Sequence, residues 1–567
     1  MVQTLHLYRA EPAVLPGYFQ AETGSQRSKS NFADPDLDST TRRFPDFKRT
    51  EQLPEASLYS GFFKMHRKTI FAGFFVFALT LTAQAPTADT RKTINSISPA
   101  ELKGDLSFLA SDALEGRYTP STGLDIAAEF IASKFRAIGL RPGGGSDYFQ
   151  SAAMLDRKLP HVITPLVGHD AETSITVEPS KIRIRQASAA VHIADAPVIK
   201  ISELNTEKLK GLVLEGKVVL VPTPDYDAIP ATDRMTVALR SRDFDRAVAA
   251  SKALAMIIAT KSPRPVPSSS LLVAEEAQTV APPVAVVESP ELLNALAKPN
   301  PLTISLDIPA PEDHQSTVKN VIGVIPGSDP VLKSSCILVT AHYDHIGTLE
   351  TGIHLTDKKP DGTDKIFNGA NDDGSGTVSV IEIARALSQL HPKRSIVFIT
   401  FFGEERGLLG STYYGNHPLF PISKTIADIN LEQVGRTDSS EGSEIANASI
   451  TGYDYSDVET YLEAAGKATG VTIYKDDKAS DQYFVRSDNA ALAERGVPAH
   501  TLTTAFEYPD YHGVGDEWQK IDYENMAKID RTVALAVLNM ANSLKAPVWN
   551  AANSKTAAFR AAQAKQR

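Results

Sequence analysis

The run Cys336-Ile-Leu-Val-Thr340 begins a pattern of strand, loop and helix that decides the fold. It is followed by an amphipathic stretch from Thr377 to Leu390 and by a second apolar run, Ser395-Ile-Val-Phe-Ile-Thr-Phe401. Near-continuous apolar strands that alternate with amphipathic helices are typical of an α/β sheet buried on both faces. In such sheets ligands bind at the carboxyl ends of the strands. The polar residues that follow each run are therefore candidates for a functional site.

The whole chain has 567 residues, which is too many for one hydrophobic core, because cores stop growing near roughly 250 to 300 residues. Apolar residues recur at three- and four-residue spacing from 98 to 140, which predicts helices that end at Gly139. From about 158 to 312 short β-branched runs and prolines dominate, with one helix around Phe244 to Ala255. We predict an α/β domain made of 86–157 and 313–548, a mostly β insert over 158–312 and a polar tail over 549–567.

The segment around residue 70 has the features of an export signal. Lys64, Arg67 and Lys68 precede an apolar run from Ile70 to Ala83, and Ala83-Gln-Ala85 ends it, in the order of a secretory signal peptide. The run is shorter than the roughly 20 residues that cross a bilayer, so we expect no permanent membrane anchor. We predict a signal peptide over 65–85 and a periplasmic or extracellular protein. Residues 1–64 would be a non-native, disordered upstream extension.

The charge distribution and the cysteine count bear on two questions: whether the chain binds nucleic acid and whether it contains a disulfide. The net charge of −10 is spread along the chain, and no basic stripe interleaved with aromatic residues is present. The sequence therefore lacks the features that track a phosphate backbone, and we expect no nucleic acid partner. The single cysteine, Cys336, excludes an intramolecular disulfide, and its apolar run predicts a small buried residue.

Two motifs with polar side chains follow the first strand. Ala341-His342-Tyr343-Asp344-His345 places an imidazole at the strand end with a carboxylate two residues later. A His whose second nitrogen is held by a carboxylate is a well-oriented metal ligand, and a hydrogen-bonded structural His is the alternative. The turn Asn368-Gly-Ala-Asn-Asp372-Asp373-Gly-Ser-Gly376 then opens a helix. Its glycines let Asp372 face the strand end as a metal ligand, while Asp373 caps the helix.

The second strand leads into Gly403-Glu404-Glu405-Arg406-Gly407. Adjacent Glu side chains repel each other unless a cation separates them or one is protonated. One Glu can bind a metal ion while its neighbour takes a proton from water. The alternative is a pair of solvated loop residues.

Two further segments complete the candidate set. Ile426-Ala-Asp-Ile-Asn430-Leu431-Glu432 ends a strand with a carboxylate, and Asp510-Tyr511-His512 supplies a second imidazole. A single catalytic zinc ion needs only three protein ligands and water. Five ligands with one bridging carboxylate suit a two-metal site. The five candidates are His342, Asp372, Glu405, Glu432 and His512.

The series AHYDH, NGANDDGSG, FFGEERGLLGS, NLEQVGR and YH resembles the M28 family of zinc exopeptidases in order and spacing. The stretch Phe108-Leu-Ala-Ser-Asp-Ala-Leu-Glu-Gly-Arg117 also resembles secreted aminopeptidases of that family. The resemblance implies a phosphorylase/hydrolase-like three-layer α/β sandwich and two zinc ions per chain. One ion would be held by His342, Asp372 and Glu432, and the other by Asp372, Glu405 and His512, with Asp372 as the bridge.

The resemblance also implies roles for neighbouring residues. Glu404 would be the general base, and Asp344 would orient His342. Glu432 stands where many relatives have Asp, so its extra methylene leaves the geometry of that zinc site open. The remaining polar residues of these motifs are assigned to the pocket or to helix capping: His345 and Asp373.

The predicted insert is similar to a protease-associated domain, on the runs Gly211-Leu-Val-Leu-Glu-Gly-Lys-Val-Val-Leu-Val221 and Ala255-Met-Ile-Ile-Ala259. It would wall or gate the cleft, and an unrelated β insertion is the alternative. The resemblance implies an exported di-zinc aminopeptidase that hydrolyses peptides with a free N-terminus. The alternatives are an M28 carboxypeptidase or dipeptidase, a one-zinc glutaminyl cyclase and a non-catalytic receptor-like relative.

Overall fold

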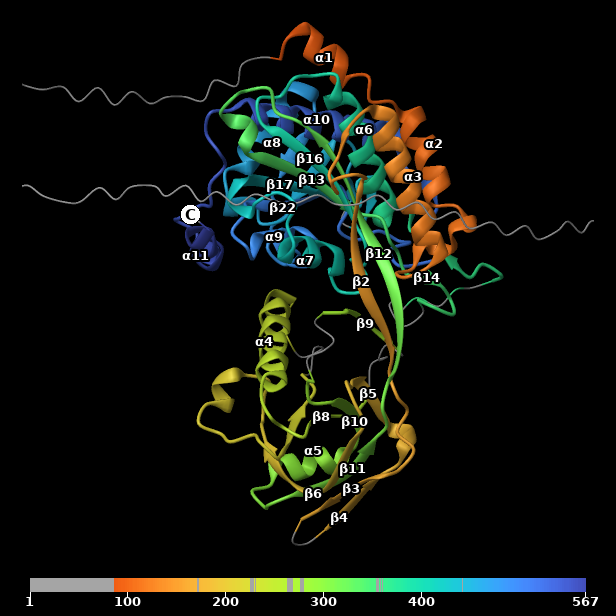
Figure 1. The fold of residues 1–567 in the computed structure, drawn as a ribbon, viewed down its shortest axis with the longest axis vertical. Coiled ribbons are helices and arrows are strands. Elements are labelled where there is room, and N and C mark those ends of the chain that lie inside the picture. The colour runs from red at the N-terminus through yellow and green to blue at the C-terminus, as the bar shows by residue number, and fades with distance from the viewer. Residues whose placement is uncertain are drawn as a thin grey trace, which may run out of the picture. The chain divides into compact units, whose positions relative to one another are not determined.

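The computed structural model describes residues 86–566 apart from gaps at 171–172, 225–228, 230, 263–268, 276–279, 353–355, 357, 359, 361 and 441. This part of the chain has a mixed α/β fold with two large sheets, of ten and eight strands (Figure 1). The predicted signal peptide over 65–85 and the extension over 1–64 lie outside the described residues. No helix in the described part is both long and apolar enough to span a bilayer.

The ten-stranded sheet and its helices are formed by segments from both ends of the described chain. The strands in sheet order are β21 (Thr472–Tyr474), β20 (Asn447–Ile450), β22 (Ala499–Thr503), β17 (Thr425–Leu431), β13 (Cys336–His342), β16 (Ser395–Phe401), β12 (Glu312–Ile325), β2 (Phe149–Lys158) and β9 (Ser269–Val273), with β1 (Arg141–Pro142) on β12. The helices outside the eight-stranded sheet region are α1 (Ala88–Ile94), α2 (Pro99–Leu109), α3 (Thr122–Ile138), α6 (Gly376–Ser388), α7 (Leu409–Asn416), α8 (Val458–Thr469), α9 (Asn489–Ala493), α10 (Tyr523–Asn542) and α11 (Ala557–Gln566).

The centre of this sheet is parallel and contains the three predicted strands. β13 lies between β16 and β17, and β22 pairs in parallel with the other side of β17. The chain passes from β13 to β16 on one side and then crosses to β17 on the other. Ligands of open α/β sheets bind at such a reversal of strand order, beyond the carboxyl ends of the strands. The fold therefore directs attention to the residues that follow β13, β16 and β17.

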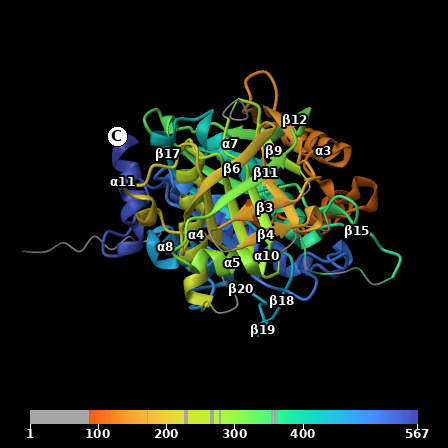
Figure 2. The same cartoon turned by 90° about the horizontal axis from the view of Figure 1, so that it is seen from below.

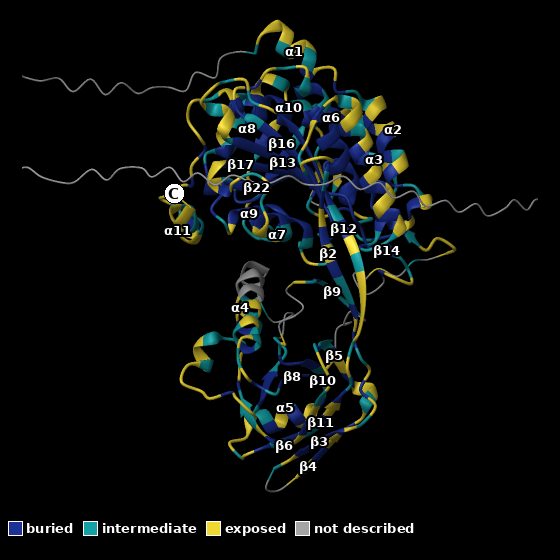
Figure 3. Cartoon of the chain, viewed as in Figure 1, coloured by how far each residue is buried: buried dark blue, intermediate teal, exposed yellow. Residues whose placement is uncertain are grey.

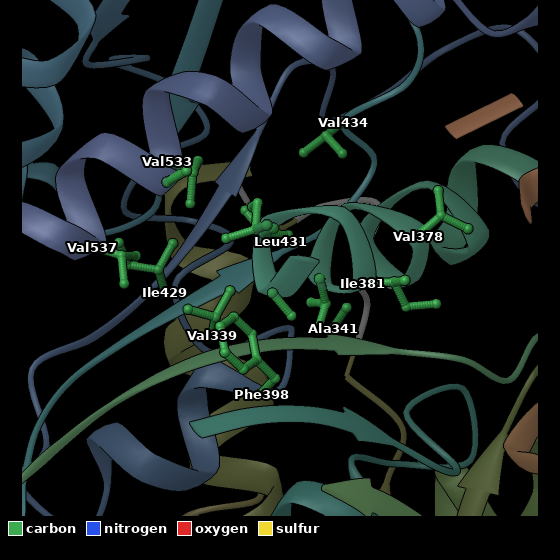
Figure 4. Close-up of a cluster of buried hydrophobic side chains, with 14 of the residues drawn as sticks. Val339, Ala341, Val378, Ile381, Phe398, Ile429, Leu431, Val434, Val533 and Val537 are labelled. Atoms are coloured by element: carbon green, nitrogen blue, oxygen red, sulfur yellow. The ribbon is translucent and has the colours of Figure 1, made fainter. Parts of the chain in front are cut away.

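Helices cover the parallel centre on both faces. Alternate residues of a strand point to opposite faces, and β13 is buried along its whole length (Figure 3). Val339 belongs to one core cluster with Val378 of α6 and Val533 of α10 (Figure 4). Leu338 belongs to a second cluster with Tyr414 of α7. Burying each such side chain stabilises the fold by about 1.5 to 3 kcal/mol, which holds the strand ends in place.

The eight-stranded sheet comes from the predicted insert. Its strands in order are β4 (Ser174–Val177), β3 (Leu166–His169), β11 (Thr303–Ile308), β6 (Val191–Lys200), β7 (Val218–Pro222), β8 (Ala255–Thr260), β10 (Val284–Glu288) and β5 (Ile182–Gln186). Figure 2 shows β11 between β3 and β6, in agreement with this order. The sheet has its own hydrophobic core, to which Leu292 of α5 (Pro290–Ala297) contributes.

Three local features differ from the sequence-based expectation or add to it. The helix expected around Phe244 to Ala255 is α4, Ala231–Ala249, and Ala255 instead begins the fully buried strand β8. β9 arises within 158–312 yet pairs with β2 of the ten-stranded sheet. The tail over 549–567 includes α11, whose Phe559 stacks on buried Trp549 at 5.0 Å. Gly139 ends α3 with a left-handed φ of 82°, as predicted.

Asp530 of α10 leads to a prediction about stability and pH. Burial raises its pKa to about 8, with Ser379 acting in the opposite direction and Glu382 adding to the rise. The folded protein thus keeps a proton that the unfolded chain releases above about pH 4, so its stability falls between about pH 4 and pH 8. Asp530→Asn cannot ionise and should avoid this loss. Its free energy of unfolding relative to wild type should rise by roughly 2 to 4 kcal/mol from pH 5 to pH 8, measured by chemical denaturation.

The matched control is Glu524→Gln, an exposed residue on the same helix. It should follow the wild-type profile at both pH values. If the stability difference between Asp530→Asn and wild type is the same at pH 5 and pH 8, Asp530 is ionised in the folded protein and the interpretation is wrong.

Candidate metal centre

All seven residues predicted for the site lie at one edge of the ten-stranded sheet or in the turn before α6. His342 ends β13, and the other residues follow parallel strands within a few residues or in the loop beyond β22. Because the four strands are parallel, these ends lie at the same edge. The structure thus brings together His342, Asp344, Asp372, Glu404, Glu405, Glu432 and His512.

The first group of ligand atoms comprises His342, Asp372 and Glu432, whose ligand atoms all lie within 4.8 Å of one another. His342 Nε2 is 3.4 Å from Asp372 Oδ1. These are the three residues that the sequence assigns to one zinc ion. The longer Glu432 side chain therefore reaches the group despite standing where many relatives have Asp.

The second group shares Asp372 with the first and also includes Glu405. His512 Nε2 lies 3.2 Å from Asp372 Oδ2 and 3.3 Å from Glu405 Oε2, as expected for the predicted set. His345 also belongs here, because its ligand atom lies within 4.8 Å of those of Asp372 and Glu405. Its Nδ1 is 2.8 Å from Glu405 Oε1. The second group therefore has two imidazoles, and the sequence analysis placed only His512 there.

Asp344 links the first histidine to Glu404. Its Oδ1 lies 3.6 Å from His342 Nδ1, and the hydrogen bond of that nitrogen, at 3.3 Å, is to the Asp344 backbone carbonyl. A hydrogen bond to the second ring nitrogen orients a metal-binding histidine. Asp344 Oδ1 accepts the backbone N–H of Glu404 at 3.1 Å. The other carboxylate oxygen of Asp344 accepts the hydroxyl of Thr119 at 3.0 Å. Glu404 Oε2 in turn is 4.0 Å from His342 Nε2.

Two further aspartates shape the turn that carries Asp372. Asp373 accepts the backbone N–H of Gly376, the first residue of α6, at 3.0 Å, which matches its predicted capping role. Asp516 is fully buried and accepts the backbone N–H groups of Asn371 and Asp372 at 3.0 and 3.1 Å. Asp516 lies four residues beyond His512 with no distinctive motif around it, so the sequence alone does not predict its role.

A buried arginine joins the two ligand-bearing loops to the N-terminal helices. Arg117 donates to the carbonyl oxygens of Tyr343 at 2.8 Å, Leu109 at 2.6 Å, Asn368 at 2.7 Å and Gly369 at 2.9 Å. It is 1% exposed, and burial lowers its pKa to about 10 against the opposing effect of Asp344 and other nearby aspartates. We name these four bonds the Arg117 clamp. Arg117 ends a motif that resembles the family, but its role as a clamp is not predicted by the sequence.

In the protein without a cation, protons on buried carboxyl and imidazole groups offset the negative charge of the site. Burial raises the pKa of Glu404 well above its usual range and that of Glu432 to about 7. Burial also opposes ionisation of Glu405, but His512 outweighs it and lowers the Glu405 pKa to about 2. Burial likewise lowers the pKa of His512, but Glu405 and Asp372 outweigh it and raise the value to about 11. A bound cation would replace these protons, since metal binding to His requires the neutral ring.

The donor set fits zinc. His342 Nε2 and Glu432 Oε2 are buried and have no hydrogen-bond partner among the described residues. Buried polar atoms in folded proteins normally have a partner, so unpartnered atoms that face each other indicate a missing ligand. Imidazole nitrogens and carboxylate oxygens are common ligands of catalytic zinc.

Four of the candidate ligands, Asp372, Glu405, Glu432 and His512, line a pocket. Glu404 also lines it, which places this carboxylate beside the candidate ligands. The remaining lining residues, most of them polar or aromatic, are Gln433, Thr451, Tyr483, Arg486, Ser487, Thr501, Thr503, Phe506 and Tyr511. None of these is predicted as a pocket residue from the sequence, because they come from separate loops and strand ends.

Residues 320–537 match the model of peptidase family M28. The chain is 25% identical over 287 residues to a probable leucine aminopeptidase 2 of Aspergillus oryzae, covering 46% of this chain and 51% of that protein. It is 27% identical over 237 residues to aminopeptidase YwaD of Bacillus subtilis, covering 41% of this chain and 46% of that protein. The chain thus spans about half the length of the curated relatives it matches.

The fold is similar to a solved structure, an aminopeptidase from Aneurinibacillus sp. strain AM-1. The similarity has a TM-score of 0.50 at 20% sequence identity and covers 79% of this chain and 95% of that chain. At this identity the similarity concerns the fold alone.

Proposed function

We propose that this chain, whose residues 320–537 belong to peptidase family M28, is an exported di-zinc aminopeptidase that hydrolyses N-terminal peptide bonds. The observation that carries the proposal is Asp372, whose carboxylate belongs to both groups of candidate ligands. A carboxylate shared between two ligand groups favours two ions over one. His342 and Glu432 would complete one zinc site, and Glu405 with His512 would complete the other.

The chemistry that zinc supplies when bound is polarisation of the scissile carbonyl and a lowered pKa of the attacking water. Glu404 lines the same pocket but belongs to neither group of ligands. Its carboxylate takes a proton from the attacking water and passes it to the nitrogen of the leaving amine. Asp344 accepts the backbone N–H of Glu404 and lies beside His342. It therefore fixes the position of the proposed general base relative to the proposed zinc ligand.

The finer description of the fold belongs to the same proposal. Helices on both faces of the ten-stranded sheet support a phosphorylase/hydrolase-like three-layer sandwich. The separate eight-stranded sheet supports a protease-associated-like insert over 158–312 that walls or gates the cleft. The signal-peptide pattern over 65–85 supports export to the periplasm or the outside of the cell.

A panel of peptides tests the proposed reaction. The zinc-loaded protein should cleave a peptide with free ends and a C-terminally amidated peptide at similar rates. It should not cleave the N-acetylated peptide measurably, because the free amine is part of what an aminopeptidase binds. A chelator should abolish cleavage, and added zinc should restore it. Product formation followed by chromatography measures each rate.

The alternatives give different results in the same panel. Cleavage of the N-acetylated peptide with loss on C-terminal amidation would identify a carboxypeptidase and contradict the proposal. Cleavage of dipeptides alone would identify a dipeptidase. Full activity in the presence of the chelator would contradict the zinc assignment.

A further inference from the structure

Arg486 is the one Arg or Lys among the described residues that line the pocket. Its guanidinium lies 4.6 Å from the ring centroid of Tyr483, a cation–π contact that holds it in place. Tyr483 is itself fixed, because its hydroxyl donates to Glu507 at 2.8 Å and its ring stacks on Phe506 at 5.1 Å. Within the described part of the chain no carboxylate forms an ion pair with Arg486. The pocket therefore holds a positioned cation with free capacity for an anion.

Gln433 supplies a second polar group that is held in place toward the pocket. Its φ is 56°, in the left-handed region that costs free energy for a residue other than glycine. The backbone is held there by bonds at both ends: its N–H donates to Asp373 at 3.2 Å, and its carbonyl accepts the Thr504 hydroxyl at 3.0 Å. The side chain is 5% exposed, and its Oε1 has no partner among the described residues. An unpartnered buried amide oxygen indicates a partner that the described residues do not supply.

The remaining wall between these two residues is also polar. Four buried residues with hydroxyl groups line it: Thr451, Ser487, Thr501 and Thr503. Each hydroxyl already hydrogen-bonds within the protein, to Asn489, the Gln433 carbonyl, the Thr501 N–H or Asn430. The wall is therefore polar, and the groups available to a ligand are those of Arg486 and Gln433.

We infer that this pocket binds a carboxylate of the substrate, paired with the Arg486 guanidinium and hydrogen-bonded by the Gln433 amide. A guanidinium binds a carboxylate through two parallel N–H donors, and either atom of an amide can face the ligand after rotation of the group. The inference rests on the proposed function, since it specifies which peptides that site prefers. The carboxylate can come from the side chain of an N-terminal Glu or Asp, or from the C-terminus of a dipeptide.

Two pairs of substrates separate these sources in the full-length, zinc-loaded protein. The first pair is the 4-nitroanilides of Glu and Gln, and the second is Leu-Gly and its C-terminal amide. In wild type, kcat/KM should favour the carboxylate member of one pair by at least tenfold. In Arg486→Gln that ratio should fall toward one, and Gln433→Leu should lower it as well. The matched control Arg141→Gln, an exposed residue of β1 outside the pocket, should keep the wild-type ratio.

The outcomes separate this inference from the proposed function. Hydrolysis of Leu-4-nitroanilide with both ratios near one, or with a ratio unchanged by Arg486→Gln, would overturn the inference and leave the aminopeptidase proposal standing. If no peptide is hydrolysed, the proposed function fails, and binding still decides the inference. Calorimetric titration of zinc-loaded Glu404→Gln with Leu-Gly and its amide, and with glutamate and glutamine, measures the same discrimination without turnover. Equal affinities within both pairs would overturn it, and a tenfold preference for either carboxylate would support it.

Discussion

Glu404→Gln should keep both zinc ions and lose turnover, with kcat falling by about 10³-fold. Gln has the size of Glu but cannot accept the proton of the attacking water. Zinc should stay bound, because Glu404 belongs to neither group of candidate ligands and lies 4.0 Å from His342 Nε2. Steady-state kinetics on an N-terminally free peptide and elemental analysis of the same sample measure the two quantities together.

The control is Glu524→Gln, an exposed Glu on α10 that belongs to neither ligand group and does not line the pocket. It should match wild type in both measurements. Near-normal turnover in zinc-loaded Glu404→Gln would remove Glu404 from the role of general base. Loss of zinc from the variant would instead show that Glu404 is a ligand.

Asp372→Asn should lose both zinc ions, because this carboxylate belongs to both ligand groups. Asn offers one neutral oxygen and cannot bridge two cations. Zinc content should drop from about two ions per chain to near zero, and kcat/KM should fall by at least about 10³-fold. A ligand that binds only the folded protein stabilises it, so a chelator should lower the Tm of wild type and leave that of Asp372→Asn unchanged.

Single-group variants make this test specific. Glu432→Gln removes a ligand from the first group alone, so we expect about one zinc ion to remain. Asp89→Asn, at the exposed start of α1, should behave as wild type. If Asp372→Asn retained one ion, the two groups would not share a bridge, and the two-ion proposal would be wrong.

The sequence was sufficient to predict which side chains that follow strands come together at the sheet edge. His342, Glu405 and Glu432 each come directly after an apolar run, and the parallel arrangement of these runs brings such residues to one edge. The sequence predicts His345 only as a pocket or capping residue, because a histidine three residues past another carries no local sign of the loop's path. Its approach to Glu405 depends on how two loops from different strands meet.

Long-range contacts account for the other differences. β9 pairs with β2 more than one hundred residues earlier in the chain, and no turn or repeat links the two segments in sequence. Asp516 acts on backbone N–H groups, and Arg117 acts on backbone carbonyls, so neither needs a partner side chain that a motif would display. The sequence likewise does not predict that Gln433 and Arg486 line the pocket, because their positions depend on which loops face each other.

The Arg117 clamp joins segments of the chain that are synthesised at different times. Arg117 precedes Tyr343 by 226 residues and Gly369 by 252, and the segment between them contains the whole eight-stranded sheet. The ribosome therefore synthesises the residues of the N-terminal helices and of this sheet before those of either loop whose carbonyls Arg117 binds. His512 comes later still, so a nascent chain cannot close the second ligand group with this imidazole until synthesis is nearly complete. The proposed second zinc site is consequently completed by His512 only after every residue of the first ligand group has been made.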